Sequence, residues 1–275
     1  MAINLAEKYS STVDEKFALE SKTASAINND YDWAGVNTVN VYTIPTSELG
    51  DYTASGTNRY GTPAELQDTV QTMTLSQDKA FTFTIDRKNY DDQMMTKEAG
   101  KALEREIREQ VIPMLDKYRI SKMVASAGTT ASAASPTKSN AYELFLKGTE
   151  ILGDNAVPET GRIAFVSYNY YNLLKQDNSF VKASDAGQQI AITGVVGYVD
   201  GTAIIPLPVS YFPSDVYLVM SHASATVAPV KLTDYKIHDN PPGINGWLVE
   251  GRIRHDAFVL ANKAKAIYVQ GKTSV

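Results

Sequence analysis

Three histidines are the side chains of this sequence best suited to acid–base chemistry near neutral pH. They are His222, His238 and His255, and no two of them have the spacing of an H-x-x-x-H or HExxH zinc motif. Ser221 precedes His222, and Asp256 follows His255. Adjacency in sequence does not make a Ser-His-Asp triad, which depends on geometry in space. We therefore expect each histidine to have a structural role.

The other short motifs are weak. S-x-x-K occurs at Ser76/Lys79, Ser135/Lys138 and Ser179/Lys182, without the companion motifs of the penicillin-binding enzymes. Residues 28–32 (NNDYD) offer oxygens to calcium but lack the glycine and distal glutamate of an EF-hand loop. Gly194, Gly197 and Gly201 bracket an expected hairpin, and the chain has neither a phosphate-binding loop nor a G-x-S-x-G elbow. We predict no catalytic, cofactor or metal site, and that the chain is not an enzyme.

Length and composition narrow the class of protein. A chain of 275 residues with 43% hydrophobic residues can bury the core of one large domain or two small ones. The net charge of −5 leaves no basic footprint for tight, sequence-independent binding of nucleic acid. The absence of cysteine fits a reducing compartment and excludes disulfides. Neither a signal peptide nor an apolar run near 18 residues is present.

The elements that would position any site are arranged around one long helical run at residues 96–128. Its apolar residues recur at spacings of three and four or their sums, and so share one helix face: Ala99, Leu103, Ile107, Met114, Leu115 and Tyr118. Asp91, Asp92 and Thr96 offer capping oxygens before the run, and Gly128 is the expected stop. Because Pro113 lies inside the run, we expect a kink near residues 109–112 or two helices in line.

Residues 36–86 instead show the two-residue period of β-strands. Val39, Val41 and Thr43 alternate with Asn40, Tyr42 and Ile44, and a polar, glycine-rich loop follows at residues 45–63. On both sides of the polar turn at residues 76–79, the apolar residues fall at odd-numbered positions: Met73, Leu75, Phe81, Phe83 and Ile85. This alternation predicts a hairpin with one apolar face. An isolated hairpin is marginal in water, and a loop this long is usually functional. The pattern favours an extended arm covered by something outside it; a hairpin folded over its own core is the alternative.

The remaining pattern mixes short helices and strands. Helices are expected from Asn140 to about residue 151 and at residues 168–176 after a Ser167 cap, with a small-residue linker at 129–139. Strands are expected at 162–166, 216–220 and 227–237, with two more around the turn 261–263. Asp200–Gly201 gives the strongest short hairpin signal, between residues 195–199 and 202–206. Leu5, Tyr9, Val13 and Phe17 indicate a short helix, either a frayed terminus or an arm that docks on a neighbour.

Three stretches, taken in order, resemble one protein family. TFTIDRKNYDDQMM (82–95) leads into EQVIPMLDKYRISKMVASAG (109–128), and GVVGYVDGTAIIPLPVSYFP (194–213) and GRIRHDAFVLANKAKAIYV (251–269) follow. They are similar to the loop strand and proline-broken spine helix, the axial-domain hairpin and the closing strands of tailed-bacteriophage major capsid proteins. The family has the Hong Kong 97-type fold, and the resemblance runs from about residue 36 onward.

The resemblance implies an α+β fold with four parts. These are an N-terminal arm (1–38), an extended β-hairpin loop (39–90), a peripheral domain (91–160 and 246–275, with the spine helix at 96–127) and a mixed axial domain (161–245). It also implies hexamers and pentamers in an icosahedral shell that encloses double-stranded DNA, contacted weakly and without sequence specificity. The location would be the virion, after assembly in the bacterial cytoplasm, with no membrane partner.

Further partners follow from the same resemblance. A scaffolding protein and a portal are expected, and the resemblance leaves open whether decoration proteins bind. Because only about 38 residues precede the loop, we expect scaffolding to be a separate protein, the alternative being that this chain is a processed form. Lys79 and Lys88 lie on or near the loop, but nothing in the sequence supplies the pocket for a lysine–asparagine cross-link, so none is predicted.

Two other functions stay open. An encapsulin-like compartment shell would share the fold but package a cargo enzyme. A soluble α+β enzyme or ligand-binding protein would have a deep pocket lined by at least one of the three histidines.

Overall fold

The computed structural model describes residues 21–31, 33, 38–47, 49–63, 65–66, 68–87, 99–132, 135–176, 197–199 and 201–271. The chain divides into two compact units: residues 1–32 with 75–275, called the body, and residues 33–74, called the arm. The N-terminal helix expected at residues 5–17, the caps expected at 91–96, and Gly194 lie outside the described residues.

The expected long helix is present and is broken where the proline predicts. It consists of α3 (Ala99–Glu106), a π-helical turn η2 (Ile107–Val111) and α4 (Ile112–Ala125). In the π turn, the Ile112 N–H donates to the Ile107 carbonyl, one residue further back than in an α-helix. The turn ends two residues before Pro113, which has no N–H to donate.

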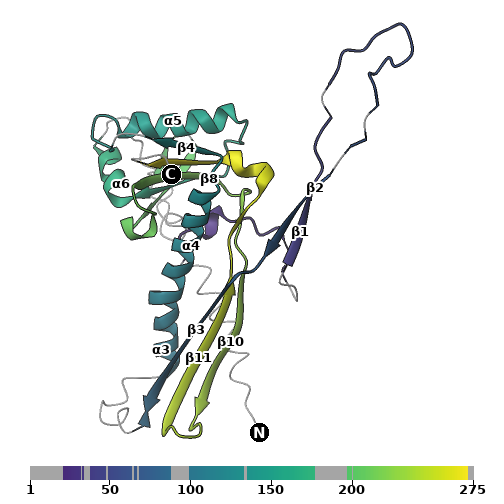
Figure 1. The fold of residues 1–275 in the computed structure, drawn as a ribbon. Coiled ribbons are helices and arrows are strands. Elements are labelled where there is room, and N and C mark those ends of the chain that lie inside the picture. The colour runs from purple at the N-terminus through teal and green to yellow at the C-terminus, as the bar shows by residue number, and fades with distance from the viewer. Residues whose placement is uncertain are drawn as a thin grey trace. The chain divides into compact units, whose positions relative to one another are not determined.

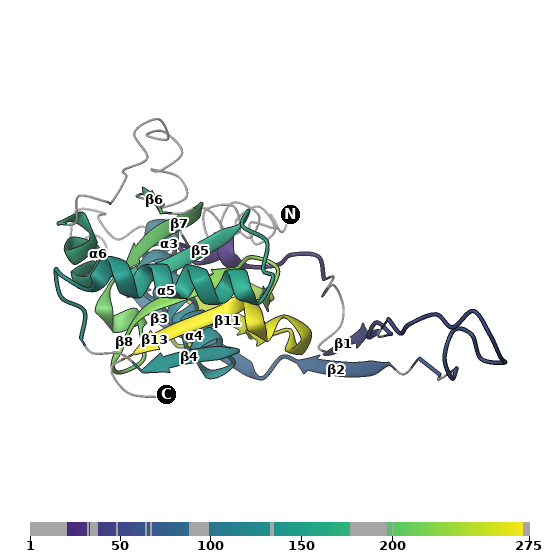
Figure 2. The same ribbon diagram turned by 90° about the horizontal axis from the view of Figure 1, so that it is seen from above.

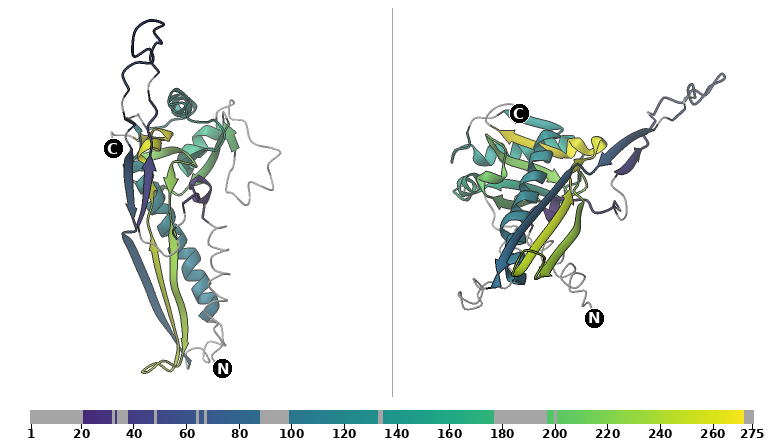
Figure 3. Two further views of the ribbon diagram at one scale, coloured as in Figure 1. Left: turned by 90° about the vertical axis from the view of Figure 1, so that its right-hand side faces the viewer. Right: turned by 60° about the horizontal axis from the view of Figure 1, so that its bottom comes forward.

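The helix packs on a three-stranded antiparallel sheet, as Figure 1 and the left view of Figure 3 show. The strands are β10 (Val230–Asp239), β11 (Gly246–His255) and β3 (Gln77–Asp86), in that order. One hydrophobic cluster joins helix and sheet: Leu103, Ile107, Val111, Ile112, Leu115, Tyr235, Val249 and Ile253. The apolar helix face predicted from Leu103, Ile107 and Leu115 is thus confirmed.

The hairpin expected around residues 76–79 is wrong. β3 pairs with β11 over its whole length, from Gln77 opposite His255 to Asp86 opposite Gly246. Phe81, Phe83 and Ile85 do share an inward face, since the two phenylalanines pack on the helix–sheet cluster and Ile85 is buried. The alternation therefore identified the buried face, but it carried no information about the partner strand.

The larger core lies under a six-stranded mixed sheet, with α5 (Ala141–Asp154) across it in Figure 2. In spatial order the strands are β4 (Thr129–Ser132), β13 (Ile267–Gly271), β8 (Val216–His222), β5 (Arg162–Ser167), β7 (Thr202–Leu207) and β6 (Gly197–Val199). The hairpin predicted at Asp200–Gly201 is confirmed, with Val199 opposite Thr202. Helix α6 (Tyr168–Lys175) is capped by Ser167, whose hydroxyl accepts from the Tyr170 N–H as expected.

Three smaller expectations need correction. The supposed linker begins with β4, an edge strand whose backbone pairs in parallel with β13, so its small side chains gave no signal. The strand expected at 227–237 is two strands, β9 (Thr226–Val227) and β10, because Pro229 lies between them. The turn expected at 261–263 extends into a 3₁₀ helix, η4 (Ala261–Ala266), which follows β12 (Phe258–Val259).

Candidate assembly surface

The arm is built on a single antiparallel pair of strands. β1 (Thr38–Thr43) pairs with β2 (Thr69–Thr74), from Thr38 opposite Thr74 to Thr43 opposite Thr69. The Thr38 and Thr74 hydroxyls lie 3.0 Å apart and add one side-chain hydrogen bond across the pair. Because β1 and β2 each pair with only one described strand, a hairpin of this kind is marginally stable in water by itself.

Exposed apolar side chains are concentrated on this arm. Of the ten large hydrophobic side chains that are exposed in the described part of the chain, seven belong to the arm: Tyr42, Ile44, Leu49, Tyr52, Tyr60, Leu66 and Val70. Tyr42 is 65% exposed and stands directly opposite Val70, which is 50% exposed. Large apolar side chains gathered on one exposed unit are typical of a surface that contacts another molecule.

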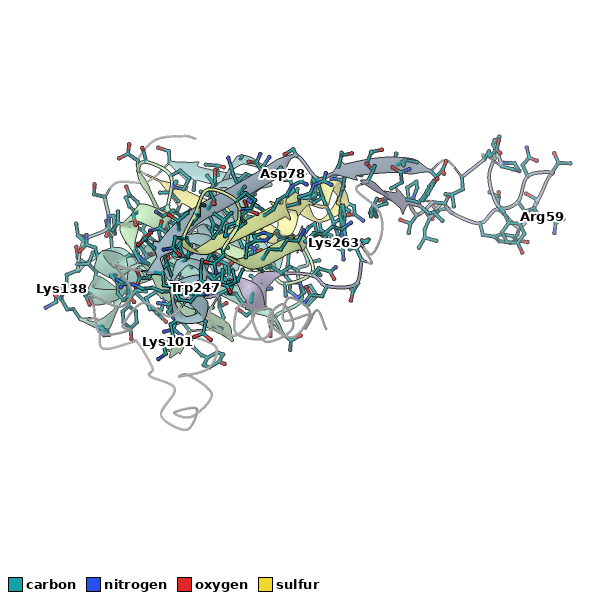
Figure 4. The ribbon with its side chains drawn as sticks, turned by 90° about the horizontal axis from the view of Figure 1, so that it is seen from below. Arg59, Asp78, Lys101, Lys138, Trp247 and Lys263 are labelled. Atoms are coloured by element: carbon teal, nitrogen blue, oxygen red, sulfur yellow. The ribbon has the colours of Figure 1, made fainter. Side chains whose placement is uncertain are left out.

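The tip of the arm's loop has a defined local structure, and Figure 4 labels Arg59 in it. The Thr53 N–H donates to the Arg59 carbonyl (3.1 Å), and the Gly61 N–H donates to the Asn58 carbonyl (2.9 Å). The rings of Tyr52 and Tyr60 meet edge to face at a centroid distance of 5.1 Å. Gly56 has a φ of +90°, a conformation that strongly favours glycine. The exposed aromatic groups are therefore held in a turn rather than scattered on an irregular coil.

The body has an open groove between β3 and α4 with a volume of about 550 Å³. Its walls are formed by Gln77, Lys79, Glu109, Gln110, Pro113, Met114, Lys117, Tyr118, Ser121 and His255. His255 is 1% exposed, and neither of its ring nitrogens has a hydrogen-bond partner among the described residues. Burial lowers the pKa of His255 from 6.5 to about 4, against the opposing effect of Asp256. This is the one histidine that the enzyme hypothesis could use.

Asp256 is engaged elsewhere and does not orient the imidazole. Its Oδ2 accepts from the Ser76 N–H (2.8 Å) and the Ser76 hydroxyl (2.7 Å). Its Oδ1 accepts from the Tyr118 hydroxyl (2.7 Å) and the Ala257 N–H (2.8 Å). These hydrogen bonds outweigh the effect of burial and lower the pKa of Asp256. A carboxylate with four donors of this kind is a structural clamp, and no Ser-His-Asp arrangement results.

The other two histidines have structural contacts, as expected. The ring of His222 lies between the Thr160 carbonyl (Nε2 to O, 2.9 Å) and Ser224, whose N–H donates to Nδ1. His238 lies diagonally across the β10–β11 pair from Glu250, with Nε2 3.3 Å from the carboxylate. Within the described residues, no group of three or more His, Asp or Glu side chains could hold a metal ion.

Of the remaining sequence candidates, some make structural contacts and others lie outside the described residues. Asn28 is buried, and its side-chain oxygen accepts from the Asp30 N–H in a local turn, while Asp32 lies outside the described residues. Ser76 binds Asp256, and Ser179 with Lys182 lies in an undescribed segment. Among the helices described, none is long and apolar enough to cross a membrane.

A buried ion pair on α4 is a feature that sequence reasoning missed. Asp116 and Arg119 are 2% and 5% exposed, and their charged atoms lie 3.6 Å apart. Asp116 accepts from the hydroxyls of Ser21 and Thr23, both at 2.6 Å, so the pair fastens the segment around η1 (Ala24–Ala26) to the helix. Burial lowers the pKa of Arg119, and the Asp116 charge opposes that shift. In sequence, the spacing of three residues between these charges is the same for a buried pair as for an exposed one.

Comparison with known proteins gives matches in structure only. No protein-family model matches the chain, and no curated protein sequence matches it either. A structure of Mycobacterium phage Che8 superposes with a TM-score of 0.72 at 17% identity, covering 92% of this chain and 91% of that one. The capsid structure of cyanophage P-SCSP1u has a TM-score of 0.66 at 12% identity, covering 87% of this chain and 84% of that one.

The virus-like particle from Pyrococcus furiosus is also similar, with a TM-score of 0.61 at 10% identity, covering 98% of this chain and 100% of that one. The general fold implied by the sequence resemblance is thereby confirmed. The chain shares its fold with the Mycobacterium phage Che8 structure, the cyanophage P-SCSP1u capsid and the Pyrococcus furiosus virus-like particle.

Proposed function

We propose that this chain is the major capsid protein of a tailed bacteriophage and assembles into the hexamers and pentamers of an icosahedral head around double-stranded DNA. The fold shared with phage capsids is the observation that carries the proposal. The net charge of −5 fits a container whose contact with DNA is weak and independent of sequence. The protein would reside in the virion after assembly in the host cytoplasm.

The arm supports self-assembly on physical grounds. It exposes seven large apolar side chains. In addition, no third strand pairs with β1 or β2 among the described residues of the arm. Covering these side chains with a neighbouring subunit would stabilise both partners, at roughly 25 cal/mol per Å² of apolar area removed from water. Repeated around a ring, one such contact per subunit produces a closed assembly.

The proposed domain organisation is the one that the resemblance implies. Residues 1–38 would be the N-terminal arm, which is a different segment from the arm of residues 33–74 described above. Residues 39–90 would be the extended loop, 91–160 with 246–275 the peripheral domain, and 161–245 the axial domain. In this division, the antiparallel pairing of β10 with β11 would cross the boundary between residues 245 and 246. A scaffolding protein and a portal protein would be the further partners.

An encapsulin-like compartment shell is the second candidate, and the similarity to the Pyrococcus furiosus virus-like particle is the observation that favours it. The contents of purified particles separate the two candidates. Double-stranded DNA with a portal protein at one vertex supports the phage capsid, whereas an encapsulated cargo enzyme without DNA supports the compartment shell.

The direct test is negative-stain microscopy with light scattering on the purified chain, alone and with any scaffolding protein encoded beside it. Closed particles or tubes of many subunits are the expected result. A stable monomer under both conditions would contradict the proposal.

Deleting residues 46–62 tests the role of the arm, because it removes the loop with Leu49, Tyr52 and Tyr60 and leaves the body intact. We expect a folded subunit that does not assemble. Normal closed shells from the deleted protein would show that the loop is not an assembly element.

A milder variant with a matched control separates loss of contacts from loss of length. Ile44 is 68% exposed on the arm, and Val209 is 64% exposed on the body. Replacing Ile44 by Ser should raise the subunit concentration at half assembly by roughly tenfold if about 1.4 kcal/mol of contact energy is lost. Val209→Ser should change that concentration little. Equal effects of the two variants would contradict a special role for the arm.

A further inference from the structure

The chain returns from the arm to the body at a point held by a buried carboxylate. The arm ends at Thr74, and Ser76 follows two residues later. Asp256 binds both the N–H and the hydroxyl of Ser76 and also accepts from Tyr118 on α4. Ser76 is itself exposed, whereas Asp256 is only 2% exposed. The buried Asp256 therefore holds Ser76, the second residue of the body after the arm, through two hydrogen bonds.

The chain also enters the arm from a fastened position. Asn28 lies five residues before the arm begins at Trp33 and is 8% exposed. Its N–H donates to the Thr226 carbonyl at 2.7 Å, and its side-chain amide lies 3.5 Å from the Ser224 carbonyl. This attachment is made to β9 and to the residue two positions before it, and neither of its hydrogen bonds involves Asp256.

A short sheet connects the two attachments. β9 pairs with β12, with Thr226 opposite Val259, and β12 begins two residues after Asp256. Two further backbone bonds close the unit, from the Asp256 N–H to the Pro229 carbonyl (3.2 Å) and from the Leu260 N–H to the Ala225 carbonyl (3.0 Å). Ala225, Thr226 and Ala257 are buried, so the connection is rigidly packed.

We propose that Asp256 and the β9–β12 pair form one anchor that holds both ends of the arm, so that loosening Asp256 loosens the Asn28 attachment as well. The anchor is a conformational device within the subunit, and it does not rest on the proposed capsid function. Releasing it would free both ends of the arm together while the helix–sheet body stays folded. Independent attachments would instead release one end at a time.

Amide hydrogen exchange on the unassembled full-length chain tests this coupling. Asp256→Asn keeps the size of the side chain but removes the charge that accepts four hydrogen bonds. We expect exchange of the Ser76 and Asn28 amides to accelerate by at least about fivefold, although no hydrogen bond of Asn28 is altered. Amides in the centre of the six-stranded sheet, such as Val219, should stay within about twofold of the unmodified protein.

Asp78→Asn is the matched control, since Asp78 is a carboxylate on the same strand as Gln77 and pairs with Arg252 on the surface. It should leave the amides of Ser76 and Asn28 unchanged. Tyr118→Phe removes one donor from Asp256 and should act in the same direction as Asp256→Asn with a smaller effect, which keeps the test usable if Asp256→Asn does not fold.

Three results would overturn the inference. In the first, Ser76 exchanges faster in Asp256→Asn but Asn28 does not, which would make the two attachments independent. In the second, the exchange rates of both amides stay the same, which would show that Asp256 stabilises neither attachment. In the third, the amides of Ser76, Asn28 and Val219 accelerate equally, which is general destabilisation.

Discussion

The buried Asp116–Arg119 pair should be the strongest electrostatic element of α4. Replacing Asp116 by Asn leaves the Arg119 charge 5% exposed without its counter-charge, and also weakens the bonds from Ser21 and Thr23. Breaking a buried pair in this way typically costs about 3–5 kcal/mol. We therefore expect Asp116→Asn to lower the free energy of unfolding by about 3 kcal/mol.

A double-mutant cycle isolates the pair. Arg119→Met should cost about 2–3 kcal/mol by itself, because Asp116 keeps its hydroxyl donors but loses the cation. The double variant should cost less than the sum by at least about 1.5 kcal/mol, since neither charge is then left buried alone. Urea unfolding at pH 7, followed by circular dichroism, measures all four proteins.

The same helix run supplies the control cycle. Arg105 and Glu109 lie 2.8 Å apart with exposed side chains, so Arg105→Met with Glu109→Gln should show a coupling of about 0.5 kcal/mol or less. If the coupling of the buried pair is no larger than that of the exposed pair, the reasoning is refuted.

Two further changes test the packing and the pH dependence of the body. A methyl group at Gly148 would lie 2.6 Å from the Met220 sulfur and 2.9 Å from the Tyr268 ring. Gly148→Ala should therefore lower the free energy of unfolding, measured by chemical denaturation, by about 1–3 kcal/mol, although alanine has the better helix propensity. Unchanged stability would show that α5 shifts freely on the sheet. His255 takes up a proton near pH 6.5 in the unfolded chain but only near pH 4 in the folded chain. The free energy of unfolding should therefore decrease by up to about 3 kcal/mol as the pH is lowered from 6.5 to 4, and the contribution of His255 should stay constant below pH 4. His255→Gln should flatten that part of the curve, and an unaltered pH profile would contradict the assignment.

Local patterns predicted the parts of this fold that depend on local physics. The three-and-four spacing of Leu103, Ile107 and Leu115 identified the buried helix face, and Pro113 located the break, because both follow from backbone geometry. Asp200–Gly201 likewise identified a hairpin, since its turn favours residues that accept a positive φ.

Long-range pairing was beyond such reasoning. The alternation of Phe81, Phe83 and Ile85 could not show that β3 pairs with a strand more than 150 residues further on. Asp116 and Asp256 were missed as structural centres because their donors, such as Ser21 and Ser76, lie far away in sequence. The exposed apolar surface was only partly foreseen: the arm was expected to need a partner, but much of its exposure comes from loop residues such as Leu49 and Tyr60.

The position of the C-terminal strands has a consequence for synthesis of the chain. β11 lies between β10 and β3, and β13 lies between β4 and β8, so both sheets are completed by strands that the ribosome makes late. Until residues 246–271 have emerged, β3 and β4 have no sheet partner, and the apolar side chains of β3 and β8 lack part of their cover. The nascent chain therefore carries unpaired strand edges until these residues have been made, and such edges make a chain prone to aggregate.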